Sequence, residues 1–297
     1  MQLKSYHSIA ASLHPWLQLV KVPLCLPVAC SAGFGYILHT PVLTPSCGAV
    51  ICGVFFLACG AAGCNSLQER AVDSLFVRTR NRPLVTGRLT EREATWCSAL
   101  LVILGLLTLL FSTEGWQPLL LGIIAVVLYN GVYTPLKQTS AFALFPGGLA
   151  GALPPLIGWT AAGGMLADNR AWFLFSLFFL WQIPHFCIIL LAHHEDYHAV
   201  EQPTLSRLFP KQGLTRITQI WILAFIVVAL AFTLDGNQLA TGARLTIALM
   251  AVILTIFCVS LFFKKKSQNY RVMFLILNGS FFSALLIVAI LQLYAAR

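Results

Sequence analysis

Charged side chains are scarce in this chain. Only 10% of its 297 residues are Asp, Glu, Lys or Arg, whereas 58% are hydrophobic. Soluble globular proteins carry about 25% charged residues, so the composition excludes a pair of soluble domains. The nine cysteines include no C-x-x-C pair and do not have the spacing of a secreted disulfide framework. We interpret them as small hydrophobic residues inside a membrane protein.

Long apolar runs take up most of the chain. They cover residues 16–38, 47–67, 94–111, 117–134, 141–161, 171–192, 216–234, 243–263 and 272–295. Each run is close to the roughly 20 residues that a membrane-crossing helix needs, whereas a β-barrel has short alternating segments. The first run is long and lacks an A-x-A cleavage site, so we expect it to span the membrane rather than to be removed as a signal peptide.

The predicted fold is therefore all-α, a polytopic membrane bundle of about nine transmembrane helices. These spans and their connections use the whole of residues 1–297, so we expect a single transmembrane domain. Several prolines lie inside the runs, where neighbouring helices can satisfy the freed backbone groups. We expect kinked helices that surround a central cavity.

Basic residues are distributed unevenly over the predicted loops. With the N-terminus on one side, that side holds 16 of the 19 Lys and Arg residues, and only Arg170, Arg244 and Arg297 fall on the other side. The positive-inside rule then predicts a cytoplasmic N-terminus and an external C-terminus. Because topology accounts for the net charge of +9, the charge gives no support for nucleic acid as a partner. Membrane lipids are the expected surroundings.

Two long loops on the basic side begin with carboxylates. Glu69 and Asp73 open the loop at about 68–93, and Glu195 and Asp196 open the loop at about 193–215. Each loop follows the second helix of a four-helix block, which suggests a weak internal repeat of helices 1–4 and 5–8, with helix 9 added. Two carboxylate clusters on one face of one bundle could share a cavity.

The first cluster has the spacing of a metal site. Asn65, Glu69 and Asp73 are four residues apart, which puts their side chains on one face of a helix. Hard oxygen ligands of this kind suit Mg²⁺, which usually takes one or two carboxylates together with substrate phosphates. The alternative to a metal site is a helix end that carries solvated charges, and spacing alone does not decide between these two possibilities.

Three arginines follow this cluster. They are Arg78, Arg80 and Arg82, and they come within one or two helical turns of the cluster. Their guanidinium groups could form bidentate hydrogen bonds with phosphate oxygens. Metal ligands and arginines together indicate a diphosphate site.

Four ordered motifs between residues 65 and about 205 resemble the UbiA superfamily of intramembrane prenyltransferases. They are Asn65 to Asp73 with Arg78-Thr79 and Asn81-Arg82-Pro83-Leu84, then Tyr133-Thr134-Pro135-Leu136-Lys137, then Gly151 to Trp159, and finally Trp181-Gln182-Ile183-Pro184-His185-Phe186 with Asp196-Tyr197. The last two are most similar to the members of the superfamily that modify haem. Four motifs in the same order are far more specific than any one of them.

The resemblance implies a reaction and its substrates. In the haem-modifying members, Mg²⁺ holds farnesyl diphosphate, ionisation gives an allylic cation, and a vinyl group of protoheme IX traps the cation before water adds. The product is haem O, and a haem-modifying enzyme or an oxidase would be the downstream partner. The expected location is a bacterial inner (plasma) membrane.

The resemblance also assigns roles to individual residues. Asn65, Glu69, Asp73 and Asp196 would be the catalytic metal ligands, Arg78, Arg82, Tyr133 and Lys137 would bind the diphosphate, and Trp181, Gln182 and His185 would bind the acceptor. A leaving diphosphate develops negative charge, which fixed cations and metal ions stabilise in a water-poor site.

Three positions depart from the family pattern. Glu69 stands where the family has Asp, Ala71 where haem-modifying members commonly have a further acid, and Glu195 where a basic residue is usual. Glu69 is one methylene longer than Asp but is still a carboxylate, so it can still bind a metal ion. The departures leave prenyl transfer to an aromatic or quinone-precursor acceptor as an alternative.

Gln182 and His185 are polar residues at bilayer depth, three positions apart on one predicted helix. Such residues usually face a cavity, and His185 would lie roughly 16 Å below Asp196 in a continuous helix. The imidazole could ligate or orient a haem. The alternative is a core histidine that is hydrogen-bonded to a neighbouring helix.

Two function classes compete with the transferase. His194-Glu195-x-x-His198 matches the H-E-x-x-H pattern of zinc proteases, although no third ligand or second signature follows it. A carrier of haem or lipid is the other alternative, but a carrier has no use for a diphosphate site. Zinc content would identify the first, and product analysis would separate the second from an enzyme.

Overall fold

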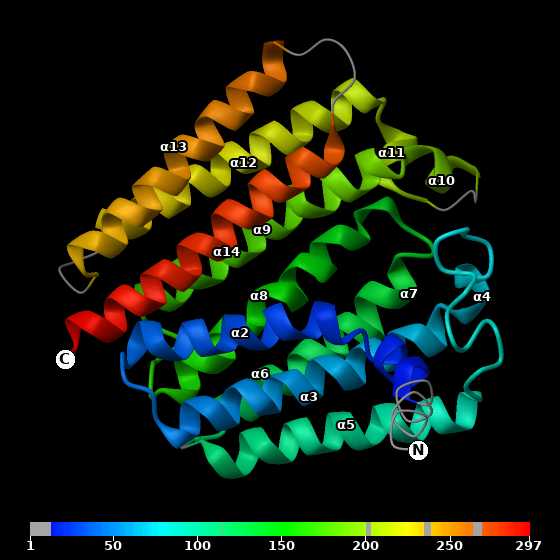
Figure 1. Ribbon diagram of the computed structural model, residues 1–297, viewed down its shortest axis with the longest axis horizontal. Helices are drawn as coiled ribbons and strands as arrows, with labels where there is room; N and C mark the ends of the chain where they lie inside the picture. Colours follow the sequence, from blue (N-terminus) through cyan, green and yellow to red (C-terminus); the bar gives the residue numbers. More distant parts are fainter. Residues whose placement is uncertain (1–12, 114, 200–202, 235–238, 264–268) are drawn as a thin grey trace, which may run out of the picture.

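The computed structural model describes residues 13–113, 115–199, 203–234, 239–263 and 269–297, and within these ranges every regular element is a helix (Figure 1). The long helices are α2 (Val22–His39), α3 (Pro45–Gln68), α5 (Glu91–Ser112), α6 (Gln117–Val126), α8 (Leu144–Ala161), α9 (Asn169–Ala192), α12 (Lys211–Leu234), α13 (Thr241–Phe263) and α14 (Tyr270–Ala295). The short elements are α4 (Arg70–Asp73), the π-helix η1 (Val127–Tyr133), α7 (Thr134–Leu136), the 3₁₀-helix η2 (Ala141–Ala143), α10 (His194–Ala199) and α11 (Leu205–Leu208).

Nine helical segments in the described ranges are long and apolar enough to cross a membrane, which confirms the predicted fold class. The predicted span at 117–134 consists of α6, η1 and α7 in succession, and the span at 141–161 consists of η2 and α8. The internal repeat of two four-helix blocks stays a prediction.

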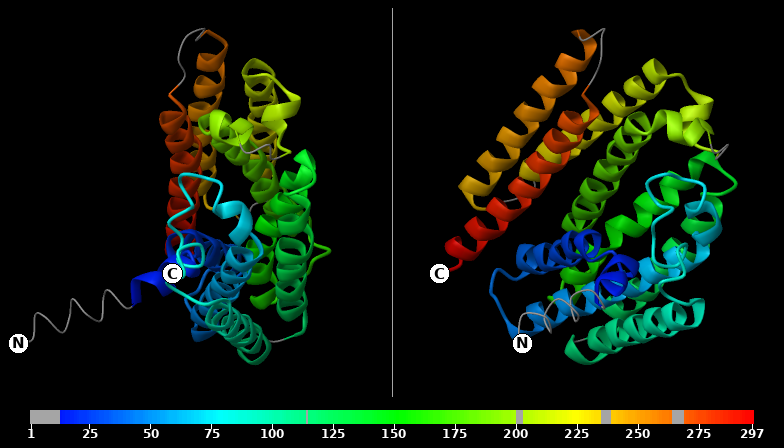
Figure 2. Two further views of the ribbon diagram at one scale, coloured as in Figure 1. Left: turned by 90° about the vertical axis from the view of Figure 1, so that its right-hand side faces the viewer. Right: turned by 45° about the vertical axis from the view of Figure 1, so that its right-hand side comes forward.

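The helices form two groups that meet along α8 and α9. In Figure 1, α2, α3, α5, α6 and α8 make up the lower part of the molecule, and α9, α12, α13 and α14 make up the upper part. Contacts of α8 with α9 and of α2 with α14 join the two parts. The short helices α4, α7, α10 and α11 gather at one end of the bundle (Figures 1 and 2). The loops that carry the predicted site are therefore close together.

Small residues let α2 and α8 approach closely. A Cβ on Gly35 would lie 1.9 Å from the carbonyl oxygen of Pro155, and a Cβ on Gly158 would lie 1.8 Å from that of Ala32. Side chains cannot occupy these positions, so the two backbones touch, as is common where small residues line the contact of membrane helices. The tight contact holds α8, which lines the cavity described below, against α2.

Side-chain caps determine where several helices begin. Thr90 and Glu93 form a capping box at the start of α5, and Asp168 accepts a hydrogen bond from the backbone N–H of Arg170 at the start of α9. Such caps satisfy N–H groups that have no partner within the helix. At α2 the preceding residue is Lys21, which has a left-handed backbone with φ of 53° and has no side-chain cap. This backbone turn is uncommon for a residue other than glycine, and it bears on the site.

Candidate functional site

Three oxygen-bearing side chains are stacked where α3 passes into α4. The backbone N–H of Glu69 donates to the carbonyl of Asn65 at 3.0 Å, and that of Asp73 donates to the carbonyl of Glu69 at 2.7 Å. The helical register therefore continues through the join, and the three side chains lie on one edge, as the spacing predicted. All three are buried. We call Asn65, Glu69 and Asp73 the oxygen row.

Each member of the oxygen row has a cation from another segment. The Lys21 Nζ donates to Asn65 Oδ1 at 2.7 Å, the Lys137 Nζ lies 2.9 Å from Glu69 Oε1, and an Arg82 nitrogen lies 2.5 Å from Asp73 Oδ2.

Two carboxylates thus face three cations, which leaves one net positive charge beside the row. A region of this charge favours an anion, and the carboxylates keep their affinity for a metal ion. The arrangement suits a metal–diphosphate group.

A chain of hydrogen bonds fixes the orientation of the Asn65 amide. The Thr134 hydroxyl donates to the carbonyl of Tyr129 at 2.8 Å, so it accepts from the Asn65 Nδ2, 3.1 Å away. The amide oxygen must then point the other way, toward Lys21. The Tyr129 carbonyl belongs to the π-helix η1, which makes i→i+5 bonds and is a form that occurs often at functional sites.

The electrostatics of the row keep Glu69 ionised. Burial by itself raises the pKa of the Glu69 carboxyl, but the charges of Lys137, Lys21 and Arg82 outweigh it and hold that pKa below its usual value. Burial, with a smaller effect of Arg82, lowers the pKa of the Lys21 amine to about 8. Both groups are therefore charged near neutral pH.

Arg78 lies on the outer side of the loop after α4, where it contacts the second long loop. Its guanidinium donates to the Tyr197 hydroxyl at 3.0 Å and lies 5.8 Å from the ring centroids of both Phe76 and Tyr197. The structure therefore brings Arg82 to the oxygen row but holds Arg78 between the two loops. The diphosphate-binding role of Arg78 stays a prediction.

Asp196 does not join the oxygen row in this structure. Its carboxylate pairs with the Nδ1 of His193 at 3.3 Å and is 48% exposed. Among the residues that the structure describes, no three His, Cys, Asp or Glu side chains come together as a metal site. The contact of Arg78 with the neighbouring Tyr197 keeps the two loops adjacent, and the metal-binding role of Asp196 stays a prediction.

The zinc-type pattern lies on α10, in the same loop. Glu195 is 93% exposed, and its ion pair with Lys211 is 3.9 Å long. The side chain of His198 lies outside the described residues. A general base in a zinc protease needs a shielded site, which the exposed position of Glu195 does not provide.

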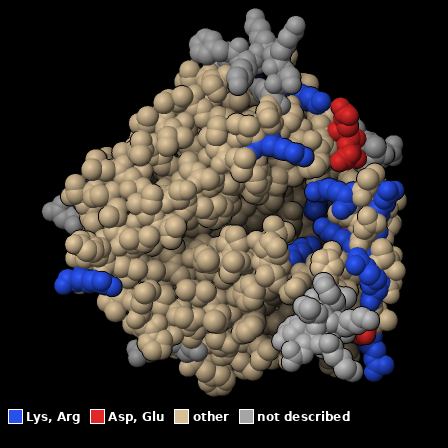
Figure 3. Space-filling view, in the orientation of Figure 1, with Lys and Arg blue, Asp and Glu red and all other residues tan. Residues whose placement is uncertain are grey.

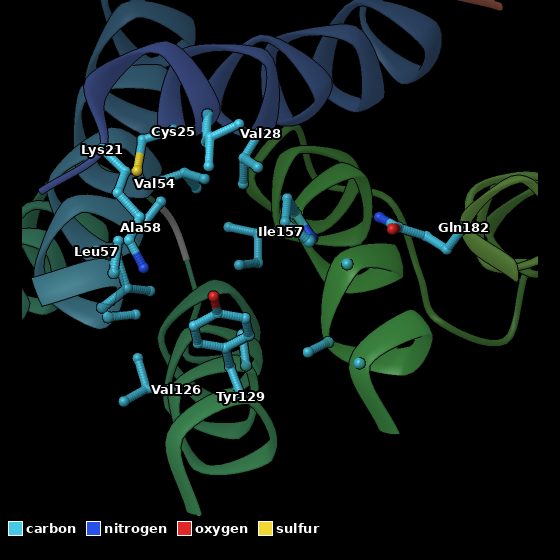
Figure 4. Close-up of a pocket in the computed structure, with 18 of the residues that line it drawn as sticks. Lys21, Cys25, Val28, Val54, Leu57, Ala58, Val126, Tyr129, Ile157 and Gln182 are labelled. Atoms are coloured by element: carbon cyan, nitrogen blue, oxygen red, sulfur yellow. The ribbon is translucent and has the colours of Figure 1, made fainter. Parts of the chain in front are cut away.

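An apolar cavity lies beneath the oxygen row. It has a volume of about 200 Å³ and is lined by Lys21, Leu24, Cys25, Val28, Val54, Leu57, Ala58, Ala61, Ala62, Ala125, Val126, Tyr129, Gly147, Ala150, Gly151, Pro154, Ile157, Gln182 and Phe186. Figure 4 shows the Tyr129 hydroxyl and Ile157 pointing into the space beside Lys21. Lys21 lines the cavity and also binds Asn65, so it connects an apolar chamber to a polar rim.

Tyr133 and Lys137 lie at the junction of this chamber and the row. The Tyr133 ring is stacked against Phe186 with centroids 6.3 Å apart, and the Lys137 Nζ lies 5.9 Å from the Tyr133 centroid. A side chain on Gly147 would collide with the Tyr133 ring at 2.8 Å. Tyr133 is thus held next to the group that pairs with Glu69, where the prediction puts the leaving diphosphate.

The predicted acceptor residues divide between two surfaces of α9. Gln182 lines the cavity, whereas His185 packs against α14, where its Nδ1 lies 2.8 Å from Asn278 Oδ1. Trp181 is buried beside His185, with ring centroids 5.0 Å apart. The acceptor-binding role of all three stays a prediction.

Sequence reasoning missed Lys21 and Thr134 as site residues. Lys21 falls inside the predicted run 16–38, where it contributes only to the topology signal, whereas in the structure it directly precedes α2. In the sequence Thr134 stands only within the Tyr133 to Lys137 motif, with no role of its own indicated. Its role depends on a contact with Asn65, 69 positions away, and no local pattern indicates that contact.

Basic side chains cover the end of the molecule at which these groups meet. In Figure 3 most of the visible Lys and Arg side chains lie along one edge, a further basic side chain lies at the opposite edge, and most of the remaining surface in this view is neither basic nor acidic. A hollow opens beside that edge, between the positions of α14 and α2 in Figure 1. A substrate with a charged head and an apolar tail matches this distribution.

Comparison with known proteins identifies relatives over most of the chain. Residues 25–294 match the model of the UbiA prenyltransferase family. The protoheme IX farnesyltransferase of Oleidesulfovibrio alaskensis is 35% identical over 227 residues, which is 76% of this chain and 79% of that protein. The protoheme IX farnesyltransferase of Geobacter sulfurreducens is 36% identical over 227 residues, which is 75% of this chain and 83% of that protein.

Solved structures share the fold at low sequence identity. A digeranylgeranylglyceryl phosphate synthase aligns with a TM-score of 0.76 and 18% identity, over 96% of this chain and 99% of that one. A UbiA homologue from Archaeoglobus fulgidus, solved with GPP and Mg²⁺ bound, aligns with a TM-score of 0.69 and 19% identity, over 95% of this chain and 98% of that one. These likenesses concern the arrangement of the helices.

Proposed function

This chain belongs to the UbiA prenyltransferase family, and from that premise we propose that it transfers the farnesyl group of farnesyl diphosphate to a vinyl group of protoheme IX, which gives haem O. The observation that carries the proposal is the oxygen row with its three cations above an apolar cavity. This is a site for a charged head and an apolar tail. Haem as the acceptor rests on the relatives that are named protoheme IX farnesyltransferase.

The donor set fits Mg²⁺. Asn65, Glu69 and Asp73 offer one amide oxygen and two buried carboxylates on one edge, and Mg²⁺ commonly uses one or two carboxylates together with substrate phosphates. Asp196, on the adjacent loop, is proposed as a further ligand. When bound, Mg²⁺ would neutralise the charge that develops on the diphosphate.

The cations of the row have a second role in this proposal. Lys21, Lys137 and Arg82 bind the row, and their N–H groups would be free to bind phosphate oxygens if Mg²⁺ were held by the carboxylates. They would then be aimed at the position where negative charge grows as the bond breaks. Arg78 and Tyr133 complete the proposed diphosphate-binding set.

The transfer breaks the C–O bond of the donor and the π bond of the vinyl group, and it forms one C–C bond and one C–O bond. The C–O bond between the farnesyl C1 and the diphosphate breaks, and the diphosphate leaves with the electron pair. A vinyl carbon of protoheme then bonds to C1, and one water adds to the cation at the second vinyl carbon and loses a proton. The walls of the cavity, which are apolar apart from Lys21, Tyr129 and Gln182, exclude other water from the allylic cation.

The acceptor would lie against α9. Gln182 lines the cavity, whereas Trp181 packs against His185 on the side of α9 that faces α14, and an aromatic ring there suits a flat macrocycle. The farnesylated haem would remain in the membrane for a haem-modifying enzyme or an oxidase.

We propose a bacterial inner membrane location with the N-terminus in the cytoplasm and the C-terminus outside. The support is the placement of 16 of the 19 basic residues on one side, of which Lys4 and Lys264 to Lys266 lie outside the described residues. An alkaline phosphatase fused after Arg297 should be active, and one inserted in the loop after α4 should be inactive. Activity in the reverse pattern would overturn the topology.

Product analysis tests the proposed reaction. Purified protein in detergent is supplied with farnesyl diphosphate, Mg²⁺ and either protoheme or a phenolic acid, and the products are identified by mass. We expect a hydroxyethylfarnesyl haem and no prenylated phenol. Prenylation of the phenol, with protoheme recovered unchanged, would show that the acceptor is aromatic and would leave only the prenyltransferase assignment.

A further inference from the structure

His185 and Asn278 form a short hydrogen-bonded chain between α9 and α14. The His185 Nδ1 lies 2.8 Å from Asn278 Oδ1, and the Asn278 Nδ2 donates to the carbonyl of Phe274 at 2.7 Å. Asn278 is 8% exposed and lies on the inner surface of α14. Neither residue is part of the oxygen row or of the cavity lining.

The hydrogen bonds from His185 through Asn278 to Phe274 determine which nitrogen of the His185 imidazole carries the proton. The Phe274 carbonyl only accepts, so the NH₂ group of Asn278 must face it, and the amide oxygen is left facing His185. That oxygen also only accepts, so the His185 Nδ1 is the donor. In a neutral imidazole the Nε2 then has a free lone pair.

The Nε2 lone pair has no hydrogen-bond partner among the described residues. The rings around His185 are aromatic: the centroids of Trp181 and Phe274 are both 5.0 Å away, and that of Phe186 is 5.7 Å away. Trp181 is itself buried, and its indole nitrogen has no partner. A buried unpaired polar atom in a membrane interior costs about 1–3 kcal/mol, so the indole nitrogen of Trp181, next to the His185 ring with its free Nε2, needs an explanation.

A haem bound at this level would use the free Nε2 lone pair through its iron and would give the Trp181 ring a polar neighbour. Iron takes the neutral imidazole nitrogen of a histidine, and a flat macrocycle packs well against aromatic rings. Histidines that ligate metals usually donate their other N–H to a fixed oxygen, which sets the tautomer and raises the basicity of the ligating nitrogen. The His185–Asn278–Phe274 chain has this form.

We propose that the Nε2 of His185 is the axial ligand of the acceptor's iron, and that Asn278 is the positioning residue that presents it. The inference rests on the proposed function, because it takes haem as the acceptor. Phe186 contacts the His185 ring and also lines the cavity. A macrocycle held at His185 is therefore next to the chamber for the farnesyl chain.

Haem binding, measured without the prenyl donor, tests this inference. The full-length protein in detergent is titrated with haem, and the absorption spectrum and the Fe–His stretching frequency of the ferrous form are recorded. We expect a nitrogen-ligated spectrum for the wild type, its loss in His185→Ala, and its return when imidazole is added to that variant. Asn278→Leu should weaken haem affinity by about 10- to 100-fold.

Two further variants make the test specific. Asn278→Asp keeps an acceptor and gives it a charge, so it should retain affinity and raise the Fe–His frequency. Ser280→Ala removes a hydroxyl of α14 that bonds within its own helix, to the Ile276 carbonyl at 2.6 Å, and should change nothing. The KM for farnesyl diphosphate should stay the same in all of the variants.

The possible outcomes distinguish a failure of the iron-ligand assignment from a failure of the proposed farnesyl transfer. Haem spectra that are unchanged by His185→Ala and by both Asn278 variants would overturn the ligand assignment, even if the wild type farnesylates haem. A nitrogen-ligated spectrum that depends on both residues would support it. A wild type that yields no farnesylated haem contradicts the proposed function, and the spectra still decide whether His185 binds iron.

Discussion

Asp73→Asn should lower kcat/KM for farnesyl diphosphate by a factor on the order of 10² to 10³. The substitution keeps the size of the side chain and removes its charge. Asp73 is buried and its carboxylate is held by Arg82 at 2.5 Å, so its loss removes a proposed metal ligand and leaves a cation without its partner. Initial rates over a range of Mg²⁺ concentrations should show that more metal is needed for half-maximal activity.

The matched control is Glu195→Gln, which makes the same change from acid to amide at a carboxylate that is 93% exposed. We expect its rates to be close to wild type, because exposed ion pairs contribute little. Asp196→Asn belongs in the same series, since its proposed metal role predicts a large loss although its carboxylate pairs with His193. Loss of activity in Glu195→Gln, together with stoichiometric zinc in the purified protein, would instead favour a zinc protease that uses the H-E-x-x-H pattern.

Lys21→Met should also reduce kcat/KM by a factor on the order of 10², because one fixed donor is lost from the position where charge develops. The lysine donates to Asn65 Oδ1 at 2.7 Å and lines the cavity, so it touches both halves of the site. Methionine fills a similar volume without charge. The affinity for inorganic diphosphate in the presence of Mg²⁺, measured by calorimetry, should fall together with the rate.

Arg92→Met is the control for general electrostatics. Arg92 is an exposed residue of the first turn of α5, on the same basic side, and lies outside the oxygen row. Removing its charge should leave diphosphate affinity within about twofold, because exposed charges are screened by salt. Equal losses in Arg92→Met and Lys21→Met would mean that the basic surface as a whole attracts the anion and that Lys21 has no specific role.

The fold could be predicted because a bilayer imposes a simple requirement on sequence. A helix that crosses it needs about 20 apolar residues, and this chain repeats that length nine times within the described ranges. The oxygen row could be predicted for a similar reason, because a spacing of four residues has one geometric meaning on a helix. Both predictions depend on periodicity along a single segment.

The remaining features of the site depend on contacts between segments. Lys21 meets Asn65 across 44 positions, and His185 meets Asn278 across 93. A spacing of three residues favours one helical face for Gln182 and His185, yet the two side chains are roughly 60° apart around an ideal helix, and this angle is enough to give them different neighbours. Gln182 reaches the cavity, and His185 reaches α14.

The π-helix η1 acts as a phase shift within one transmembrane segment. Each residue of an α-helix turns the chain by roughly 100°, so the extra residue of a π-turn rotates everything that follows by about that angle. Ala125 and Val126, before the shift, and Tyr129, in the first part of η1, face the cavity. After it, Thr134 and Lys137 face Asn65 and Glu69. One transmembrane segment thus contributes side chains both to the apolar cavity and to the oxygen row. In a uniform α-helix the side chains after η1 would point in a different direction.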